Sequence, residues 1–449
     1  MRCKPQVWCV LLAGCQHALA AITLDLTSHD SIISAAKQAA AGMVQYYTGD
    51  RPGDVPGNLP APYYWWEAGA MFGSLIDYWY FTGDDQYNAI TMQAMLHQVG
   101  PDAAFMPPNQ TKTLGNDDQA FWAMAALSAA ENRFPNPGES VGVSWLAVAQ
   151  AVFNLQAARW NMETCGGGLK WQIFAFNNGY DYKNTISNGC FFNMGARLAV
   201  YTGNKTYADW ADKTWDWSSR ILFDQNYNFY DGSDDKLNCT ELDHIQWTYN
   251  AGTFLVGAAN MYNFTGGAQI WHDRIVGIIG NLKIFLQDGV MYEVACEDAG
   301  TCNVDQRSFR AYLARWMAAT IVRAPFTRDL LKPILETSAQ AAVATCTGGQ
   351  DGNQCGLGWR TRQFDGQMGV GEQMSVLEII QANLIDYVEG PATAENGISE
   401  GDPSAGTQSP VGPEDLNKNP ISTADRVGAV IMTVFLLAMV FGTAWWMIS

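Results

Sequence analysis

One short turn recurs along this chain, and each time it separates two helical patterns. It reads Tyr-Phe-Thr-Gly at residues 80–83, Tyr-Thr-Gly at 201–203 and Phe-Thr-Gly at 264–266. Glycine commonly ends a helix because it adopts the left-handed conformation without steric cost. A second helical pattern begins within a few residues of each turn. The repeat therefore predicts a chain built from antiparallel helical hairpins.

Twelve helical patterns can be counted, which makes six hairpins. The expected ranges are 31–47, 66–82, 86–99, 116–133, 142–160, 187–202, 206–221, 248–264, 268–284, 306–323, 328–345 and 371–388. The first helix of several hairpins is apolar nearly all round, as in residues 68–73 and 251–257, and such a helix is buried. The second helices are more polar. The pattern predicts an all-α fold, an (α/α)6 barrel with inner and outer helix rings, and one short strand hairpin near 290–294.

The long connections all run from an outer helix to the next inner helix. They cover residues 48–65, 100–115, 161–186, 222–247, 285–305 and 346–370. All six should therefore lie at one end of the barrel, where the inner helices begin. Because long loops on a rigid scaffold commonly carry function, we expect the active face at this end.

The composition favours a large folded body and disfavours some partners. Of 449 residues, 48% are hydrophobic and 16% are charged, which is ample for a large core. The 44 acidic residues exceed the 26 basic ones and give a net charge of −18. Such a surface repels phosphate, so neither nucleic acid nor an anionic membrane face is an expected partner.

Both ends of the chain look like targeting segments. Residues 1–20 have a basic start, an apolar run and an Ala-Leu-Ala cleavage site, which predicts a secretory signal peptide. Residues 427–449 are uncharged and long enough to span a bilayer, and no basic flank follows. We expect a GPI-attachment signal there, with a retained single-span anchor as the alternative. The catalytic domain is expected over 21–391 and a polar linker with the attachment site over 392–426.

A secreted chain is expected to use its cysteines in disulfides. The expected pairs are Cys296 with Cys302, Cys346 with Cys355, and Cys165 with Cys239. Cys190 is then left over, and we expect it to be buried and inert. Sequons for N-glycosylation stand at Asn109, Asn204, Asn238 and Asn263.

No cofactor is expected. The histidines lack metal-ligand spacing and the cysteines are assigned to disulfides, so the sequence predicts no metal site. The acidic stretch 231–235 is expected to be a polar turn, with a calcium loop as the alternative.

Two adjacent carboxylates stand out at the start of an inner helix, within Leu-Gly-Asn-Asp-Asp-Gln-Ala-Phe-Trp at 114–122. The plain alternative is helix capping, with Asn116 as the N-cap and Gln119 completing a capping box. The helix is inner, however, so Asp117 and Asp118 should lie at the barrel mouth. Neighbouring carboxyls there can lie roughly 5 Å apart, the separation used in retaining glycoside hydrolysis. Burial and the neighbouring charge would keep one of them protonated.

Aromatic and polar residues gather at other predicted helix starts on the same face. The candidate sugar-binding residues are Trp65, Trp66, Gln119, Trp122, Trp171, Asn188, Asp243, His244, Trp247, Tyr249 and Asn250. Aromatic rings stack on the apolar faces of sugars, while amides and carboxylates bind hydroxyls. At each position the alternative is barrel packing for an aromatic residue and helix capping for a polar one.

Together these motifs resemble glycoside hydrolase family 76. The motifs are residues 116–122, Trp65–Trp66, Gly-Gly-Leu-Lys-Trp at 167–171 and Thr-Tyr-Asn-Ala-Gly at 248–252. The resemblance runs in order from about Leu24 to Tyr387. It implies an endo-α-1,6-mannanase with an (α/α)6 barrel, in which Asp117 is the nucleophile and Asp118 the general acid/base.

The GPI-type tail narrows the resemblance to the fungal "defective in cell wall" branch of the family. That branch implies action on the mannose core of GPI glycans and transfer of anchored proteins onto wall β-glucan. We therefore expect a secreted, GPI-anchored, monomeric enzyme of the outer plasma membrane and cell wall, working with retention. The alternatives are a non-catalytic, lectin-like mannan-binding wall protein and an (α/α)6 enzyme for another glycan, such as a glucanase.

Overall fold

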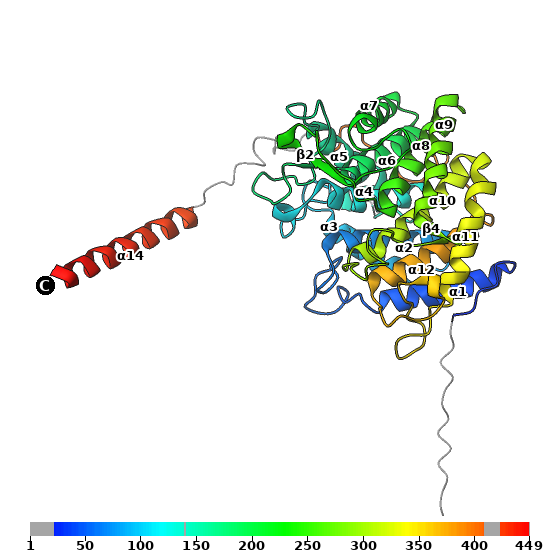
Figure 1. Cartoon of the computed structure of the whole chain (residues 1–449), viewed down its shortest axis with the longest axis horizontal. Helices are drawn as coiled ribbons and strands as arrows, with labels where there is room; N and C mark the ends of the chain where they lie inside the picture. The colour runs from blue at the N-terminus through cyan, green and yellow to red at the C-terminus, as the bar shows by residue number, and fades with distance from the viewer. Residues whose placement is uncertain (1–21, 139–140, 408–422, 449) are drawn as a thin grey trace, which may run out of the picture.

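The computed structural model describes residues 22–138, 141–407 and 423–448. The expected signal peptide, residues 1–20, lies outside the described residues. Nearly all of the domain expected from the sequence lies within them, and helices dominate its secondary structure (Figure 1).

Six helices form an inner ring. They are α2 (Trp65–Thr82), α4 (Asn116–Glu131), α6 (Thr185–Thr202), α8 (Thr248–Phe264), α10 (Phe309–Arg323) and α12 (Val370–Gln381). Each packs on the next along the chain, and α12 packs on α2, so the ring is closed. Most residues of these helices are buried, as expected for helices that are apolar nearly all round.

Six more helices surround this ring. They are α1 (His29–Val44), α3 (Asn88–Gln98), α5 (Trp145–Ala158), α7 (Lys205–Ile221), α9 (Gln269–Asn281) and α11 (Arg328–Val343). The helices α3, α5, α7, α9 and α11 each pack on the preceding inner helix, and α1 packs on α12. All twelve predicted helices are present, eleven of them within three residues of their expected ends, and α12 ends at Gln381, seven residues before the expected end. The (α/α)6 barrel is confirmed.

The turns that suggested hairpins have the expected backbone. Gly83 and Gly203 follow α2 and α6 with φ values of 69° and 68°, in the left-handed region. Gly266 also has a positive φ of 66°, although the cap of α8 is Thr265. The short turns lie at one end of the barrel, here called the floor, where inner helices end. The long loops lie at the opposite end, the mouth, where inner helices begin.

Short strands and 3-10 helices decorate the loops. The strands are β1 (Tyr182–Asn184), β2 (Gly232–Asp234), β3 (Leu242–Asp243), β4 (Leu286–Gln287) and β5 (Val290–Met291). The 3-10 helices are η1 (Thr111–Thr113), η3 (Asp235–Leu237), η4 (Leu282–Phe285), η5 (Gln306–Ser308), η6 (Pro325–Thr327), η7 (Trp359–Thr361) and η8 (Ala382–Leu384). The β4–β5 hairpin lies close to the expected position.

The antiparallel sheet β1–β2–β3 was not predicted from the sequence. Its middle strand occupies most of the stretch 231–235, which was expected to be a polar turn. The expectation failed because β2 pairs with β1 from a distant mouth loop as well as with β3 from its own loop, and no local pattern reveals the long-range pairing.

Three disulfides join Cys165 to Cys239, Cys296 to Cys302, and Cys346 to Cys355. These are the pairs expected from the sequence. Among the seven cysteines that the structure describes, Cys190 has no disulfide partner and is buried within α6, as also expected.

The first part of the range expected to be a polar linker lies on the barrel. Residues 391–407, here called the strap, pack against the barrel, and hydrogen bonds join them to α4, α5 and α6. The helix α14 (Thr423–Ile448) follows farther along. It contains the one stretch of the described residues that is long and apolar enough to cross a membrane, Arg426–Thr443.

Candidate active site

A cavity of about 280 Å³ opens at the barrel mouth. Its lining consists of Trp66, Asp117, Asp118, Phe121, Trp171, Tyr182, Asn184, Ile186, Asp231, Trp247, Tyr249, Asp305, Gln306 and Phe309. Six of these residues were candidates from the sequence: Trp66, Asp117, Asp118, Trp171, Trp247 and Tyr249. Four carboxylates and seven aromatic rings thus line one space, whose described lining includes no lysine, arginine or histidine.

Asp117 and Asp118 lie in the first turn of α4, side by side in the cavity wall. The Oδ1 atom of Asp117 accepts the backbone N–H of Asp118 at 2.9 Å, and the Oδ2 atom of Asp118 accepts the N–H of Gly115 at 2.7 Å. The helix cap is therefore Gly115, one residue before the expected Asn116. Asp118, not Gln119, accepts the N–H of the cap residue, and this is half of a capping box, because glycine has no side chain to complete it.

Gly115 is a steric requirement of the site. Its backbone φ of −84° is open to any residue, so the need is not conformational. A Cβ atom built at Gly115 would lie 2.3 Å from Oδ1 of Asp117 and 3.2 Å from Oδ2 of Asp118. Any side chain at this position would therefore displace the carboxylate pair.

Asn184 supplies a further donor to the pair. Its Nδ2 atom donates to Oδ2 of Asp117 at 3.1 Å, while its Oδ1 atom accepts the N–H of Ser187 as the N-cap of α6. Because the cap uses the oxygen of the amide, the nitrogen is the atom that faces Asp117. The carboxylate is thus held from two different inner helices.

Burial raises the pKa of both acids. For Asp117 the second cause is the negative charge of Asp118, and the donors from Asn184 and the Asp118 N–H act in the opposite direction. For Asp118, the hydrogen bond from Gly115 opposes the effect of burial on the pKa. Two buried, interacting carboxyls share one proton over the near-neutral range. Asp117 is buried more deeply than Asp118, which is half-buried.

Aromatic rings form much of the remaining wall. Tyr249 stacks on Phe309 with ring centroids 3.8 Å apart and planes at 10°, and Trp66 packs against Phe121 at 4.7 Å. Trp171 is 37% exposed at the rim. Flat, partly exposed rings of this kind suit stacking on a pyranose.

Two acids in the wall were missed in the sequence. Asp231 accepts hydrogen bonds from the Tyr182 hydroxyl at 2.8 Å and from Nε1 of Trp247 at 2.9 Å. Asp305 stands directly before η5. Burial raises the pKa of both. The available signal for Asp305 was its position in a long loop directly before an inner helix, which it shares with the Asp117–Asp118 pair.

Five candidates lie behind the wall. Trp122 is fully buried and donates to the carbonyl of Trp65, whose own Nε1 donates to Gln98. Gln119 donates to the Ala104 carbonyl and accepts from Arg159.

The other two of the five are asparagines. Asn188 is buried and bonds the backbone of Leu169 with both ends of its amide. Asn250 is buried in α8, and neither amide atom has a protein partner among the described residues. These five side chains support the cavity from outside its lining.

The remaining two candidates lie farther out. A second, open cavity of about 460 Å³ shares Trp171, Tyr182 and Asp231 with the first and continues past Asp243 on β3. His244 is exposed and packs on the ring of Tyr230 at 4.3 Å. The groove therefore extends from the acid pair across the small sheet.

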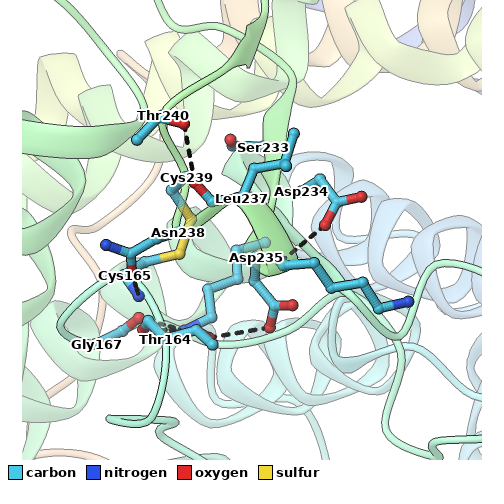
Figure 2. The surroundings of a disulfide bond; sticks show 12 residues. Thr164, Cys165, Gly167, Ser233, Asp234, Asp235, Leu237, Asn238, Cys239 and Thr240 are labelled. Atoms are coloured by element: carbon cyan, nitrogen blue, oxygen red, sulfur yellow. Dashed lines mark hydrogen bonds between the residues drawn. A yellow bond between two sulfur atoms is a disulfide. The ribbon is translucent and has the colours of Figure 1, made fainter.

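A clamp fixes the loop that carries Trp171. Figure 2 shows Cys165 and Cys239 joined beside Thr164 and Asp235, whose side chains are 3.1 Å apart. The buried Lys183 donates to the carbonyls of Thr164 and Gly167 at 2.8 and 2.6 Å. Lys183 lies between the cavity residues Tyr182 and Asn184, so this clamp also fixes both of them.

Among the residues that the structure describes, no group of His, Cys, Asp and Glu side chains is placed to hold a metal ion. Three of the four sequon asparagines, at 109, 238 and 263, are exposed, and Asn204 is half-buried at the start of α7. N-glycosylation at these positions stays a prediction.

Two concentric helix rings with adjacent acids in an aromatic mouth define the class of helical-barrel glycosidases. The chain belongs to glycosyl hydrolase family 76, whose model matches residues 31–395, and it is therefore a glycoside hydrolase. It is 46% identical over 432 residues to the mannan endo-1,6-alpha-mannosidase DCW1 of Saccharomyces cerevisiae, covering 95% of each chain. It is 43% identical to DFG5 of the same yeast, covering 95% of this chain and 94% of that relative.

Solved structures share the fold. The crystal structure of Dfg5 from Chaetomium thermophilum in complex with glucosamine has a TM-score of 0.83 and 47% identity, covering 86% of this chain and 98% of that one. An inactive alpha-1,6-mannanase variant from Salegentibacter, with two adjacent aspartates changed to asparagine, was solved with alpha-1,6-mannotriose. It has a TM-score of 0.64 and 17% identity, covering 80% of this chain and 99% of that one.

Proposed function

We propose that this protein is a retaining endo-α-1,6-mannosidase that also transfers the mannosyl group to another sugar. The observation that carries the proposal is the Asp117–Asp118 pair, which lines an aromatic cavity without cationic side chains. Sequence relatives named mannan endo-1,6-alpha-mannosidases match almost the whole chain, which supports the same linkage as the substrate here.

Asp117 is the nucleophile in this proposal. Its carboxylate accepts hydrogen bonds from Asn184 and from the Asp118 N–H, and both favour the anion. It attacks the anomeric carbon while the bond from that carbon to the leaving oxygen breaks. A covalent mannosyl-enzyme results.

Asp118 is the general acid/base. It is the less buried of the two, so it can exchange a proton with a leaving group or an acceptor at the cavity opening. It gives its proton to the departing oxygen and later takes one from water or from a sugar hydroxyl. The oxygen of that acceptor bonds to the anomeric carbon while the bond to Asp117 breaks, which frees the carboxylate, and a sugar hydroxyl that arrives before water gives transglycosylation.

The remaining lining residues bind the glycan in this proposal: Trp66, Trp171, Trp247 and Tyr249 through their rings, and Asp231, Asp305 and Asn184 through hydroxyl contacts. The excess of carboxylates also suits a glycan that carries a protonated amine. The Chaetomium Dfg5 structure contains glucosamine, an amino sugar, which supports this preference.

The native setting is the outer plasma membrane and cell wall, where the protein is GPI-anchored and acts as a monomer. The enzyme would cleave the mannose core of a GPI glycan and pass the anchored protein to β-glucan. The apolar α14 segment is compatible with an anchor signal. The domain boundaries expected from the sequence, 21–391 with a linker beyond, belong to this proposal, with the strap added to the folded part.

The decisive experiment follows anomeric configuration by NMR with an aryl α-mannoside and α-1,6-mannotetraose. Retention gives the α product first. Azide should rescue Asp117→Ala to the β-mannosyl azide and Asp118→Ala to the α-mannosyl azide, because only the second variant keeps the nucleophile. If each variant gave the azide of the opposite configuration, Asp118 would be the nucleophile and Asp117 the general acid/base.

The lectin-like alternative makes a different prediction. Purified wild-type protein would bind mannan in calorimetry but neither cleave nor transfer it, and Asp117→Asn would leave that binding unchanged. A glycan panel including β-glucans separates a mannosidase from a glucanase.

A further inference from the structure

The strap, residues 391–407, carries the chain from the floor of the barrel to its mouth side. Helix α12 begins at the mouth and ends at the floor. The strap then crosses the floor, where the N–H of Ala392 donates to the carbonyl of Glu131 and that of Ala394 to the carbonyl of Tyr201, both at 2.7 Å. Glu131 ends α4 and Tyr201 lies at the end of α6, so the crossing passes beneath the inner ring.

The strap next climbs the outer wall along α5, which runs from floor to mouth. The N–H of Leu146 in the first turn of α5 donates to Oγ of Ser399 at 3.0 Å. The N–H of Asp402 donates to Oε1 of Gln150 at 2.6 Å. The Nδ2 atom of Asn154 donates to the carbonyl of Ala405 at 2.8 Å. Each contact lies about one helical turn closer to the mouth.

Glycines bring the strap close to the helix. A Cβ at Gly401 would lie 2.6 Å from Oε1 of Gln150, and one at Gly406 would lie 2.7 Å from the carbonyl oxygen of Ala151. Gly406 also has a positive φ of 75°. The strap is therefore a fitted part of the wall, and it reaches Thr407 near the mouth loop 159–184, which begins directly after α5.

The strap ends on the mouth side of the barrel, and the candidate membrane-spanning helix α14 comes after it in the chain. Fifteen residues, 408–422, separate the strap from α14. Such a stretch covers at most about 50 Å even when fully extended, and less when it is not. A retained α14, or a GPI group attached within 408–422 in its place, would tether the barrel to a bilayer from its mouth side, and a tether of this length permits several orientations.

The mouth loops also carry exposed apolar side chains, and their contact with a bilayer would favour one of those orientations. Between 37% and 62% of each of the following residues is exposed: Val55, Tyr64, Met162, Trp171, Phe176, Leu237, Ile245 and Met368. Met162, Trp171 and Phe176 belong to the loop next to the strap. This group is here called the rim. Partly exposed aromatic and aliphatic residues of this kind insert at the level of lipid headgroups.

We propose that the barrel lies with its mouth against the surface of a zwitterionic lipid bilayer, held by the mouth-side tether and the rim. The net charge of −18 disfavours an anionic surface. In this orientation the cavity meets glycans at the height of lipid headgroups, where those attached to lipid anchors begin. The proposal deepens the proposed function, because it makes a membrane-resident glycan the substrate.

The orientation can be measured without using activity. The membrane-anchored protein, in phosphatidylcholine vesicles that contain nitroxide-labelled lipid, receives a fluorophore on a single new cysteine. Cys190 is buried, which leaves the new cysteine as the reactive one. A label at Phe176→Cys should be quenched strongly, whereas labels at Leu330→Cys and Ile270→Cys, in the floor-side first turns of α11 and α9, should not. Equal quenching at all three, or strongest quenching near the floor, would overturn the proposal.

A second experiment asks whether the orientation serves catalysis. In Met162→Ser/Phe176→Ser/Met368→Ser, turnover of a vesicle-borne, lipid-linked α-1,6-mannoside should fall about tenfold. Turnover of soluble α-1,6-mannotetraose should not change. The matched control is Ile270→Ser/Val276→Ser, which removes exposed apolar side chains from α9 and should affect neither rate.

The outcomes separate the two proposals. An equal loss on both substrates, or no loss on the vesicle-borne one, rejects the membrane orientation. No turnover of either substrate by the wild-type protein rejects the proposed function, while the quenching pattern still decides the orientation.

Discussion

Both ends of the barrel hold buried carboxylates, but those at the floor are paired with arginines, whereas those that line the mouth cavity are not. At the floor, Arg315 lies 2.9 Å from Asp77 and 2.6 Å from Glu378. Glu131 lies 2.8 Å from Arg197 and 3.7 Å from Arg323. At the mouth, four aspartates line the cavity, and its described lining residues include no lysine, arginine or histidine.

This difference separates structural charge from functional charge. The three floor arginines pair with three acids contributed by α2, α4 and α12, so the network ties the inner ring together. The four cavity acids instead rely on backbone N–H groups, the side chains of Asn184, Tyr182 and Trp247, and the positive ends of inner helices. Those donors stabilise a carboxylate without placing a full positive charge beside it. The acid can therefore gain and lose a proton during the reaction.

The strongest contrast is expected from the acid pair itself. Asp117→Asn and Asp118→Asn should each reduce turnover of an α-1,6-mannoside by about 10⁴-fold or more, because each removes a group that acts in the reaction. Thermal melting should stay at the wild-type temperature or rise, since each variant removes a repulsive buried charge. A fall of the melting temperature together with modest activity loss would mean that the pair is structural.

The floor should behave in the opposite way. Glu131→Gln leaves Arg197 and Arg323 without their carboxylate, so the free energy of unfolding should fall by about 3–5 kcal/mol. Folded protein below its melting temperature should keep nearly normal kcat. Chemical denaturation and steady-state kinetics on the same preparation test both parts, and a large kcat loss without destabilisation would contradict the contrast.

Gly115→Ala tests how closely the mouth geometry is specified. The added methyl group meets both carboxylates, which can swing away, so the fold should remain. We expect kcat to fall about 100-fold, because misplaced catalytic groups lose alignment with the reacting atoms. The control is Gly280 in α9, because its Cβ position has open space around it and its backbone is ordinary. Gly300 would not serve as a control, because its φ is positive. Gly280→Ala should leave kcat unchanged.

Asn184→Ser should have a smaller effect. Serine keeps the cap of α6 but removes the amide donor from Asp117, so kcat/KM should fall about tenfold. Loss of the donor raises the pKa of Asp117, which must be ionised to attack. The acid limb of the kcat/KM profile should therefore move to higher pH. An unmoved limb would show that the hydrogen bond does not act on the nucleophile.

The smallest effect concerns stability against pH. A carboxyl whose pKa is raised on folding binds protons more tightly in the folded state, so its contribution to stability falls as pH rises from its unfolded pKa towards its folded pKa. The pKa values of Asp117 and Asp118 are both raised. When the pH rises from 4 to 8, the melting temperature of Asp117→Asn/Asp118→Asn should therefore fall by about 2 °C less than that of the wild type. If the melting temperatures of the two proteins changed equally with pH, the two acids would not be buried and would not share a proton.

The sequence predicted the scaffold well because helices are local. Apolar periodicity and Thr-Gly turns lie within each hairpin, so all twelve helices could be found, and the long loops indicated the functional end. The acid pair was visible for the same reason, since its two members are adjacent in a single helix turn.

The rest of the wall depends on long-range folding. Asp231 and Asn184 reach the cavity through the sheet β1–β2–β3, whose strands come from two distant loops. Helix geometry explains the candidates that lie behind the wall. Phe121 is four residues after Asp117 and shares its face, whereas Trp122 is rotated about 100° farther and points into the core.

The closure of the inner ring has a consequence for how the protein must be made. The first helix packs on the last inner helix, and that helix also completes the ring against α2. No shorter N-terminal portion of the chain can bury all of its apolar inner helices. During synthesis, the faces of α1 and α2 that pack on α12 stay uncovered until some 380 residues have emerged, so closure of the inner ring comes at the end of synthesis of the barrel.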